Sequence, residues 1–316
     1  MSIHDIGTPD EPRRVVASAT HLTKKFGSFT AVDDVSFEIE RNKIYGFLGR
    51  NGAGKTTVMQ MMTAQMRESD GEISVFGERP WENPRALSHV CFVKESQKYP
   101  DDLKVKNAIA QASHILPHWD NDFAAELLRD FDLPLGRKIK KLSRGMTSAL
   151  GIVIGLASRA PLTFFDEPYL GLDAVSRHMF YDRLLADYAE NPRTVVLSTH
   201  LIDEVSNLIE HVILIDKGRI LLDAESDDLR ERAFEITGPT EAVDRFAAEH
   251  RVLHRTALGS TARATIDGRL NDHQQSLGVA SGLSIEPIPL QQLIIDRTTS
   301  HSGAIHESTT AEEALS

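Results

Sequence analysis

The stretch Gly49-Arg50-Asn51-Gly52-Ala53-Gly54-Lys55-Thr56 follows the spacing G-x-x-x-x-G-K-[ST]. It continues a run at residues 43–49 that is rich in strand-forming side chains, and it leads into residues 56–66, which have the character of a helix. Glycine lets the backbone curl so that successive N–H groups face one anion, and the following helix adds its positive N-terminal end. A strand, this loop and a helix in that order predict a site for the phosphates of a nucleotide.

The side chains of the loop have expected roles toward the nucleotide and its metal ion. Lys55 supplies a mobile positive charge for the β- and γ-phosphates. Thr56 offers a hydroxyl to Mg²⁺, and Thr57 is expected to bond the α-phosphate. The loop alone does not separate ATPases from GTPases, kinases, helicases or recombinases. The predicted nucleotide-binding residues of this segment are Gly49, Arg50, Asn51, Gly52, Ala53, Gly54, Lys55, Thr56 and Thr57.

The strand-like run at residues 162–167 ends with an acidic pair, Asp166 and Glu167, and Pro168 follows it. Such a pair by itself is typical of a strand end with solvated charges. In a chain that also has a phosphate-binding loop, the pair favours a catalytic role. We expect Asp166 to hold Mg²⁺ through water, and Glu167 to polarise the attacking water as a general base.

The composition of the chain restricts the class of protein. The chain has 316 residues, of which 41% are hydrophobic, so a substantial core can form. The formal net charge of -11 disfavours nucleic-acid binding, because an acidic surface repels phosphate backbones. The single cysteine, Cys91, excludes an internal disulfide and is typical of a reducing cytosol. No window approaches about 18 consecutive apolar residues, so we expect a membrane role to need a partner chain.

The apolar pattern divides the chain into segments. Residues 1–14 are polar and predict a flexible arm, and residues 299–316 predict a disordered tail. Residues 15–228 predict one large α/β domain, with a helical subdomain at about 98–157. Residues 229–298 predict a small α+β domain.

Further strand and helix signals lie within these segments. Residues 162–167 and 194–200 are nearly all apolar, as expected of buried parallel strands, and residues 211–223 predict a hairpin that turns at 216–218. In the C-terminal segment the predicted order is β-α-β-β-α-β, with Thr240 as the N-cap of its first helix and a final helix at 289–297.

The run Leu142-Ser143-Arg144-Gly145-Met146 separates the nucleotide-binding classes. It resembles LSGGQ, the signature of ABC-type ATPases, and departs from it at Arg144 and Met146. The resemblance extends over residues 15–222 and implies a P-loop ABC cassette, with a mixed sheet core and a helical subdomain. It also implies ATP hydrolysis in a sandwich dimer, in which Ser143 and Gly145 reach the γ-phosphate bound by the opposite subunit.

The same resemblance gives roles to two more segments. His200 stands where the family has its switch histidine, which contacts the γ-phosphate and orients Glu167. Gly171-Leu172-Asp173 resembles the D-loop, which couples the two sites, and Asp173 is included among the expected nucleotide-binding residues. Tyr169 and Leu170 stand where threonine and serine are common.

Two further assignments leave alternatives open. Phe26 occupies the place of the aromatic residue that stacks on adenine, which is the role we favour, and the alternative is a core residue of the first sheet. After the strand at 89–93 the family has a glutamine near Mg²⁺. Counting places Glu95 there, and Gln97 follows two residues later.

The resemblance predicts an ATP-hydrolysing transporter subunit on the inner face of the cell membrane. It would drive a separate permease and pair with a second cassette, either identical or a sister subunit. The C-terminal appendix is similar to that of drug and bacitracin exporters, which favours export. A soluble factor for ribosomes, DNA repair or assembly is disfavoured by the single phosphate loop and the absence of sustained heptads. A regulatory cassette without catalysis is disfavoured by the intact Lys55, Asp166, Glu167 and His200.

Overall fold

The computed structural model describes residues 15–94 and 97–294. The predicted arm, the predicted tail, Glu95 and the end of the predicted final helix lie outside the described residues. Among the described residues, those within Met1–Lys43 and Thr56–Val195 form one compact unit, and those within Ile44–Lys55 and Val196–Ser316 form a second. The predicted boundary between residues 228 and 229 is not tested by this division and stays a prediction.

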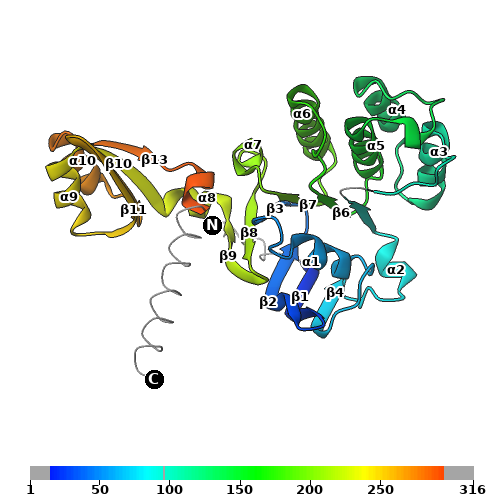
Figure 1. Cartoon of the computed structure of the whole chain (residues 1–316), viewed down its shortest axis with the longest axis horizontal. Coiled ribbons are helices and arrows are strands. Elements are labelled where there is room, and N and C mark those ends of the chain that lie inside the picture. Colours follow the sequence, from blue (N-terminus) through cyan, green and yellow to red (C-terminus); the bar gives the residue numbers. More distant parts are fainter. Residues whose placement is uncertain (1–14, 95–96, 295–316) are drawn as a thin grey trace, which may run out of the picture. The chain divides into compact units, whose positions relative to one another are not determined.

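An antiparallel sheet of three strands belongs to the first unit, with the order β2-β1-β4 (Figure 1). Its strands are β1 (Val15–Phe26), β2 (Phe29–Glu40) and β4 (Asp70–Val75). In β2, buried Val35, Phe37 and Ile39 alternate with exposed neighbours, which is the period of a half-buried strand. The two strands stay paired up to their shared hairpin, where Phe26 lies opposite Phe29.

A group of helices between the strands of the first unit lies together in Figure 1. These are α3 (Val105–Ile115), α4 (Asn121–Asp130), the 3₁₀ turn η1 (Ile139–Lys141) and α5 (Arg144–Ala157). Side chains cap two of them: Asp120 accepts from the backbone N–H of Phe123, and Ser143 accepts from that of Met146. The other helices described between residues 55 and 231 are α1 (Lys55–Met62), α2 (Pro84–Leu87), α6 (Ala174–Glu190), α7 (Ile202–Val205) and α8 (Ser226–Glu231).

A mixed sheet of six strands has the order β5-β6-β7-β3-β8-β9. Its strands are β3 (Ile44–Leu48), β5 (Val90–Val93), β6 (Leu162–Asp166), β7 (Thr194–Thr199), β8 (His211–Asp216) and β9 (Arg219–Glu225). β5 runs parallel to β6 and β3 parallel to β8, whereas β8 and β9 form an antiparallel hairpin. Every residue of β3, β6 and β7 is buried, which explains why their sequences are dominated by apolar residues and lack the alternation of a half-exposed strand. Lys217 and Gly218 have positive φ, as the predicted hairpin turn requires.

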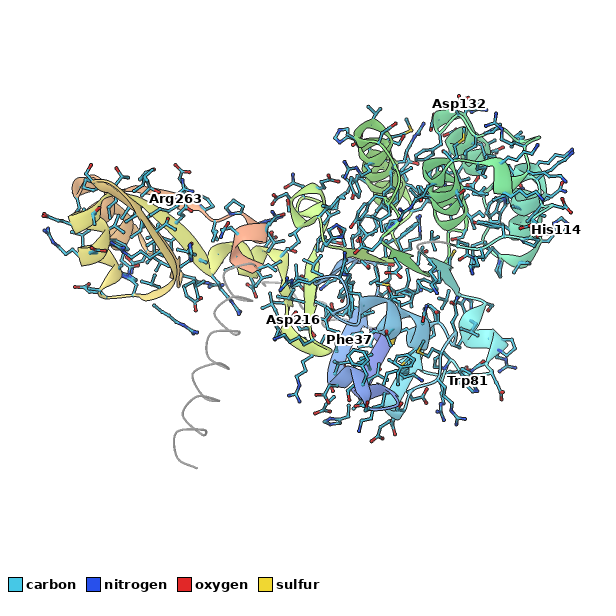
Figure 2. All side chains as sticks on the ribbon, in the orientation of Figure 1. Phe37, Trp81, His114, Asp132, Asp216 and Arg263 are labelled. Carbon is cyan, nitrogen blue, oxygen red and sulfur yellow. The ribbon has the colours of Figure 1, made fainter. Side chains whose placement is uncertain are left out.

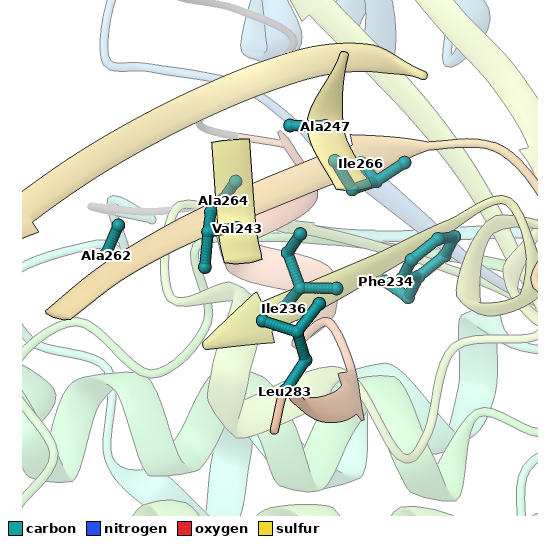
Figure 3. Close-up of a cluster of buried hydrophobic side chains, with 8 residues drawn as sticks. All are labelled: Phe234, Ile236, Val243, Ala247, Ala262, Ala264, Ile266 and Leu283. Atoms are coloured by element: carbon teal, nitrogen blue, oxygen red, sulfur yellow. The ribbon is translucent and has the colours of Figure 1, made fainter. Parts of the chain in front are cut away.

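A four-stranded antiparallel sheet forms the C-terminal part, in the order β11-β12-β10-β13. Its elements are β10 (Ala233–Pro239), α9 (Thr240–Ala247), β11 (Arg251–Leu258), β12 (Thr261–Asp267), α10 (Asp272–Ala280) and β13 (Ser284–Pro287), in the predicted order. A core that includes Phe234, Ile236, Val243 and Ile266 packs between the sheet and α9 (Figure 3). Arg263, labelled in Figure 2, pairs with Glu235 on the neighbouring strand at 3.3 Å.

One detail of this part corrects the sequence prediction. Thr240 is the first residue of α9, and Pro239 stands at the N-cap without a side-chain capping bond. The ladder explains the shift, because β10 continues through Pro239, which pairs with Thr261, and the backbone N–H of Thr240 donates to Ser260. Among the described residues, no helix combines the length and apolar character needed to cross a membrane.

Candidate nucleotide-binding site

The phosphate-binding loop connects β3 to α1, and its backbone requires glycine. Gly49 and Gly52 both have positive φ, a region that L-residues rarely adopt. A Cβ atom on Gly49 would also overlap the carbonyl oxygen of Ile215. The loop is closed by a turn in which Ala53 donates to the carbonyl of Arg50 at 3.1 Å. The sequence therefore forms the curled loop that its glycine spacing predicted.

Lys55 is buried at the start of α1, with 5% of its surface exposed. Its ammonium donates to the carbonyl oxygens of Gly49 at 2.7 Å and Arg50 at 3.3 Å. A buried ammonium needs partners, and these two loop carbonyls provide them. The positive charge is thus held against the loop itself, where phosphate oxygens could exchange for the carbonyl contacts.

Thr56 and Asp166 meet, although they are far apart in sequence. The hydroxyl of Thr56, in α1, donates to Oδ2 of Asp166, at the end of β6, at 2.7 Å. The Asp166 carboxylate is 1% exposed. A hydroxyl and a carboxylate are the hard oxygen donors that Mg²⁺ takes in proteins. Their proximity therefore fits the predicted metal site, with these two residues as the groups that would hold the ion.

Glu167 follows β6 in an unusual backbone conformation. Its φ is 48°, in the left-handed region that is uncommon for residues other than glycine. The next residues form a tight turn, in which the N–H of Leu170 donates to the carbonyl of Glu167 at 3.2 Å and Pro168 takes the second position. The hydroxyl of Tyr169 donates to Oε2 of Glu167 within this turn.

The sequence prediction missed this contact. Tyr169 was treated only as a departure from a common threonine, whereas its phenol is 3% exposed and bonded to the candidate general base. The available signal was chemical, because a buried tyrosine hydroxyl usually finds a polar partner and Glu167 lies two residues away.

The signature run packs against the D-loop of the same chain. Ser143 caps α5 by accepting from Met146 N at 3.1 Å. A Cβ atom on Gly145 would lie 2.5 Å from the carbonyl oxygen of Gly171, so only glycine fits this approach. The hydroxyl of Ser148, one turn along α5, donates to the carbonyl of Leu170 at 2.6 Å. These contacts join the signature helix to the turn that carries Glu167.

The other candidates have different surroundings. Asp173 caps α6, since its Oδ1 accepts from Ser176 N at 2.8 Å, and this bond is the main cause that lowers the pKa of its carboxyl. Phe26 is 47% exposed, with the Lys24 ammonium 5.3 Å from its ring centre, so it is not a core residue. His200 directly follows β7 and is exposed.

Of the two candidates for the family's glutamine near Mg²⁺, Glu95 and Gln97, the structure describes Gln97. It lines a cavity of about 200 Å³ together with Lys94, Arg144 and Glu167. Gln97 and the candidate base therefore line the same cavity. Which of the two candidates approaches Mg²⁺ stays a prediction.

The glycine loop with its buried lysine, and the contact between Thr56 and Asp166, define the class of a P-loop protein that binds a nucleoside triphosphate. The profile of the ABC transporter family matches residues 32–170. The chain is 30% identical over 220 residues to the bacitracin transport ATP-binding protein BcrA of Bacillus licheniformis, which covers 69% of this chain and 72% of that protein. It therefore belongs to the ABC transporter family, as an ATP-binding and ATP-hydrolysing subunit.

Other similar proteins support the same family assignment. The doxorubicin resistance ATP-binding protein DrrA of Mycobacterium tuberculosis (strain CDC 1551 / Oshkosh) is 31% identical over 228 residues, covering 69% of this chain and 68% of its own. Among solved structures, the ATP-binding subunit of an ABC transporter superposes with a TM-score of 0.62 at 24% identity, covering 68% of this chain and 92% of that one. The predicted P-loop ABC fold is confirmed.

Proposed function

We propose that this chain hydrolyses MgATP as one half of a cassette dimer and drives a separate membrane permease, as an exporter. The observation that carries the proposal is the hydrogen bond between Thr56 and Asp166, placed next to buried Lys55 and followed directly by Glu167. Each group of this set has a distinct role in transferring a phosphoryl group to water.

The hydrolytic step needs a nucleophile, a proton acceptor and charge stabilisation. The oxygen of a water molecule attacks the γ-phosphorus, the bond to the bridging oxygen of ADP breaks, and the Glu167 carboxylate accepts the proton of the water. Lys55 and the loop N–H groups of residues 49–56 bind the phosphates and offset their negative charge. His200 would contact the γ-phosphate and orient Glu167.

The metal ion would be held by the Thr56 hydroxyl and the Asp166 carboxylate. When bound, Mg²⁺ supplies positive charge that neutralises the phosphate oxygens in the transition state. Either Glu95 or Gln97 would complete the donor set. Phe26, exposed at the end of β1, would offer its ring face to adenine.

The place of the signature run supports the proposed dimer. Ser143 and Gly145 stand at the N-terminus of α5, where helix N–H groups attract anions, and we place them on the nucleotide of the opposite subunit. A solved cassette with this fold is a dimer in a post-hydrolysis state, bound to ADP and Pi. The second cassette would be a copy of this chain or a sister subunit.

Names of the relatives support export. They include proteins for bacitracin transport, doxorubicin resistance and Nod factor export. We place this chain on the inner face of the membrane, bound to a permease. We also place a domain boundary near residue 228, because the eight buried residues that form the C-terminal core all come from β10, α9, β12 and Leu283, which directly precedes β13.

The test replaces Glu167 with Gln, which keeps the shape of the side chain and removes its ability to accept a proton. We expect turnover to be abolished while ATP binding is retained, which traps a dimer that size-exclusion chromatography with light scattering detects. Lys55→Ala serves as the contrasting variant, because it should weaken ATP binding itself. Wild-type turnover by Glu167→Gln would remove Glu167 from the mechanism.

A second experiment addresses the partner. The tagged chain is purified from detergent-solubilised membranes, and the co-purifying chains are identified by mass spectrometry. We expect a protein with several membrane spans. Recovery with ribosomes alone would refute the transport role while leaving the ATPase chemistry intact.

A further inference from the structure

Tyr169 is buried beside the candidate general base. Its side chain is 3% exposed, and its hydroxyl donates to Oε2 of Glu167. The Glu167 residue is itself only 6% exposed. A phenylalanine would fill the same space, so packing alone does not require the hydroxyl. The polar contact is the feature that a tyrosine adds at this position.

The backbone holds the phenol and the carboxylate in a fixed relation. Both belong to the four-residue turn closed by Leu170 N and the Glu167 carbonyl, and Pro168 restricts the backbone between them. A second turn follows, in which the N–H of Leu172 donates to the carbonyl of Tyr169 at 3.0 Å. Tyr169 is therefore fixed on both sides by backbone hydrogen bonds.

The anchoring extends from this turn to the signature helix. Ser148 of α5 donates to the carbonyl of Leu170, the residue that closes the first turn. The turn that positions the Tyr169 ring is thus the same turn that is bonded to α5. A hydroxyl held in this way can fix a neighbouring carboxylate without moving itself.

We propose that Tyr169 is a positioning residue for ATP hydrolysis: its hydroxyl fixes the rotation of the Glu167 carboxylate so that the carboxylate is aimed at the attacking water. This proposal rests on the proposed role of Glu167 as general base. A carboxylate rotates about its last side-chain bond, and a charge-assisted hydrogen bond to one oxygen fixes the direction of the other. Tyr169 keeps its own proton throughout, and the proton of the water passes to Glu167.

The left-handed backbone of Glu167 supports this role. Uncommon backbone conformations outside glycine carry a cost in free energy and occur where the surroundings determine them. Here the following proline, the two turns and the phenol together hold the residue. Proton transfer depends on such geometry, because the base must lie within hydrogen-bond reach of the water.

The test is Tyr169→Phe, which removes the hydroxyl and keeps the ring. We expect kcat to fall about 10- to 100-fold, the rate equivalent of one hydrogen bond to a charged group, with the KM for ATP unchanged. The KM should not move because the hydroxyl acts on the base and not on bound nucleotide. The matched control is Tyr188→Phe in α6, which removes a tyrosine hydroxyl bonded to the Asn42 carbonyl at 2.6 Å. Both constants of the control should equal those of the wild type.

The outcomes separate this proposal from the one on which it rests. If Glu167→Gln is inactive and Tyr169→Phe turns over at the wild-type rate, the role of Tyr169 is refuted and that of Glu167 stands. Equal losses in Tyr169→Phe and Tyr188→Phe, or a parallel change of KM and kcat, would also refute positioning. If Glu167→Gln retains turnover, both proposals fail together.

Discussion

Replacing Gly155 with alanine tests how closely the signature helix is packed against the strand that carries Asp166. A Cβ atom at this position of α5 would lie 2.5 Å from Cε1 and 2.7 Å from Cζ of Phe165, and 2.7 Å from Cγ2 of Val93. Carbon atoms in contact prefer about 3.5 to 4.0 Å, so these side chains must yield by roughly 1 Å. Phe165 is fully buried and packs edge-on against Phe180 at 5.4 Å, which leaves it little room.

The magnitude follows from two opposing effects. Overpacking a core costs about 1 to 3 kcal/mol, whereas alanine gains about 1 kcal/mol over glycine within a helix. Gly151, also buried in α5, is the matched control, because its added Cβ would meet only Cγ1 of Val93, at 3.0 Å. Both variants receive the same helical gain. The difference between them therefore isolates the overpacking at Gly155, and we expect Gly155→Ala to be less stable by about 1 to 3 kcal/mol.

Urea unfolding of both variants, followed by circular dichroism, measures this difference, and steady-state ATPase assays accompany it. Because Phe165 directly precedes Asp166, its displacement should also lower the kcat of Gly155→Ala relative to Gly151→Ala. Equal unfolding free energies for the two variants would refute the steric argument.

Two other predictions concern stability. Asp187→Ala should cost about 3 to 5 kcal/mol in urea unfolding, because Arg193, 5% exposed, would lose a buried carboxylate partner; an unchanged free energy of unfolding would contradict this. Burial lowers the pKa of His211, but hydrogen bonds and charge from Asp223 and Glu225 outweigh it and raise the pKa above 6.5. Protonation of His211 is therefore more favourable in the folded state than in the unfolded state, and it stabilises the fold. This contribution to the free energy of unfolding should be complete below pH 6.5 and lost as pH rises through the folded pKa. The check is the free energy of urea unfolding of wild type and His211→Gln, measured below pH 6.5 and above the folded pKa. If the two proteins lose stability in parallel as pH rises, His211 does not make this contribution.

Much of the cassette could be predicted because its signals are local. The loop at residues 49–56 encodes its own curvature through glycine spacing. The buried strands β3, β6 and β7 are rich in apolar residues without alternation, because neither face meets water. The last two residues of the hairpin turn at 216–218 are Lys217 and Gly218, and both have positive φ. Each of these features is readable without knowledge of distant contacts.

The helix α6 had no counterpart among the predicted elements, although it is a long helix. Its buried residues are Phe180, Tyr181, Leu184 and Asp187, and the last of these is charged. An apolar pattern that includes a carboxylate is not recognisable until the partner, Arg193, is known. The partner of a buried charge lies outside the helix, so the apolar pattern of the helix alone does not show that Asp187 is buried. For that reason the sequence pattern did not reveal this helix.

The departures from the family pattern show why side-chain identity alone misjudges a site. Leu170 stands where serine is common, yet Ser148 bonds its backbone carbonyl, which any residue supplies. Gly145 approaches the carbonyl of Gly171, again a backbone atom, so the contact between signature helix and D-loop does not depend on the changed side chain. Tyr169 differs in kind, because its hydroxyl makes a bond that the common threonine could not place in the same position. A substitution leaves the site intact when the contact at that position is made by the backbone. A substitution gives the site a new interaction when the new side chain itself makes the contact.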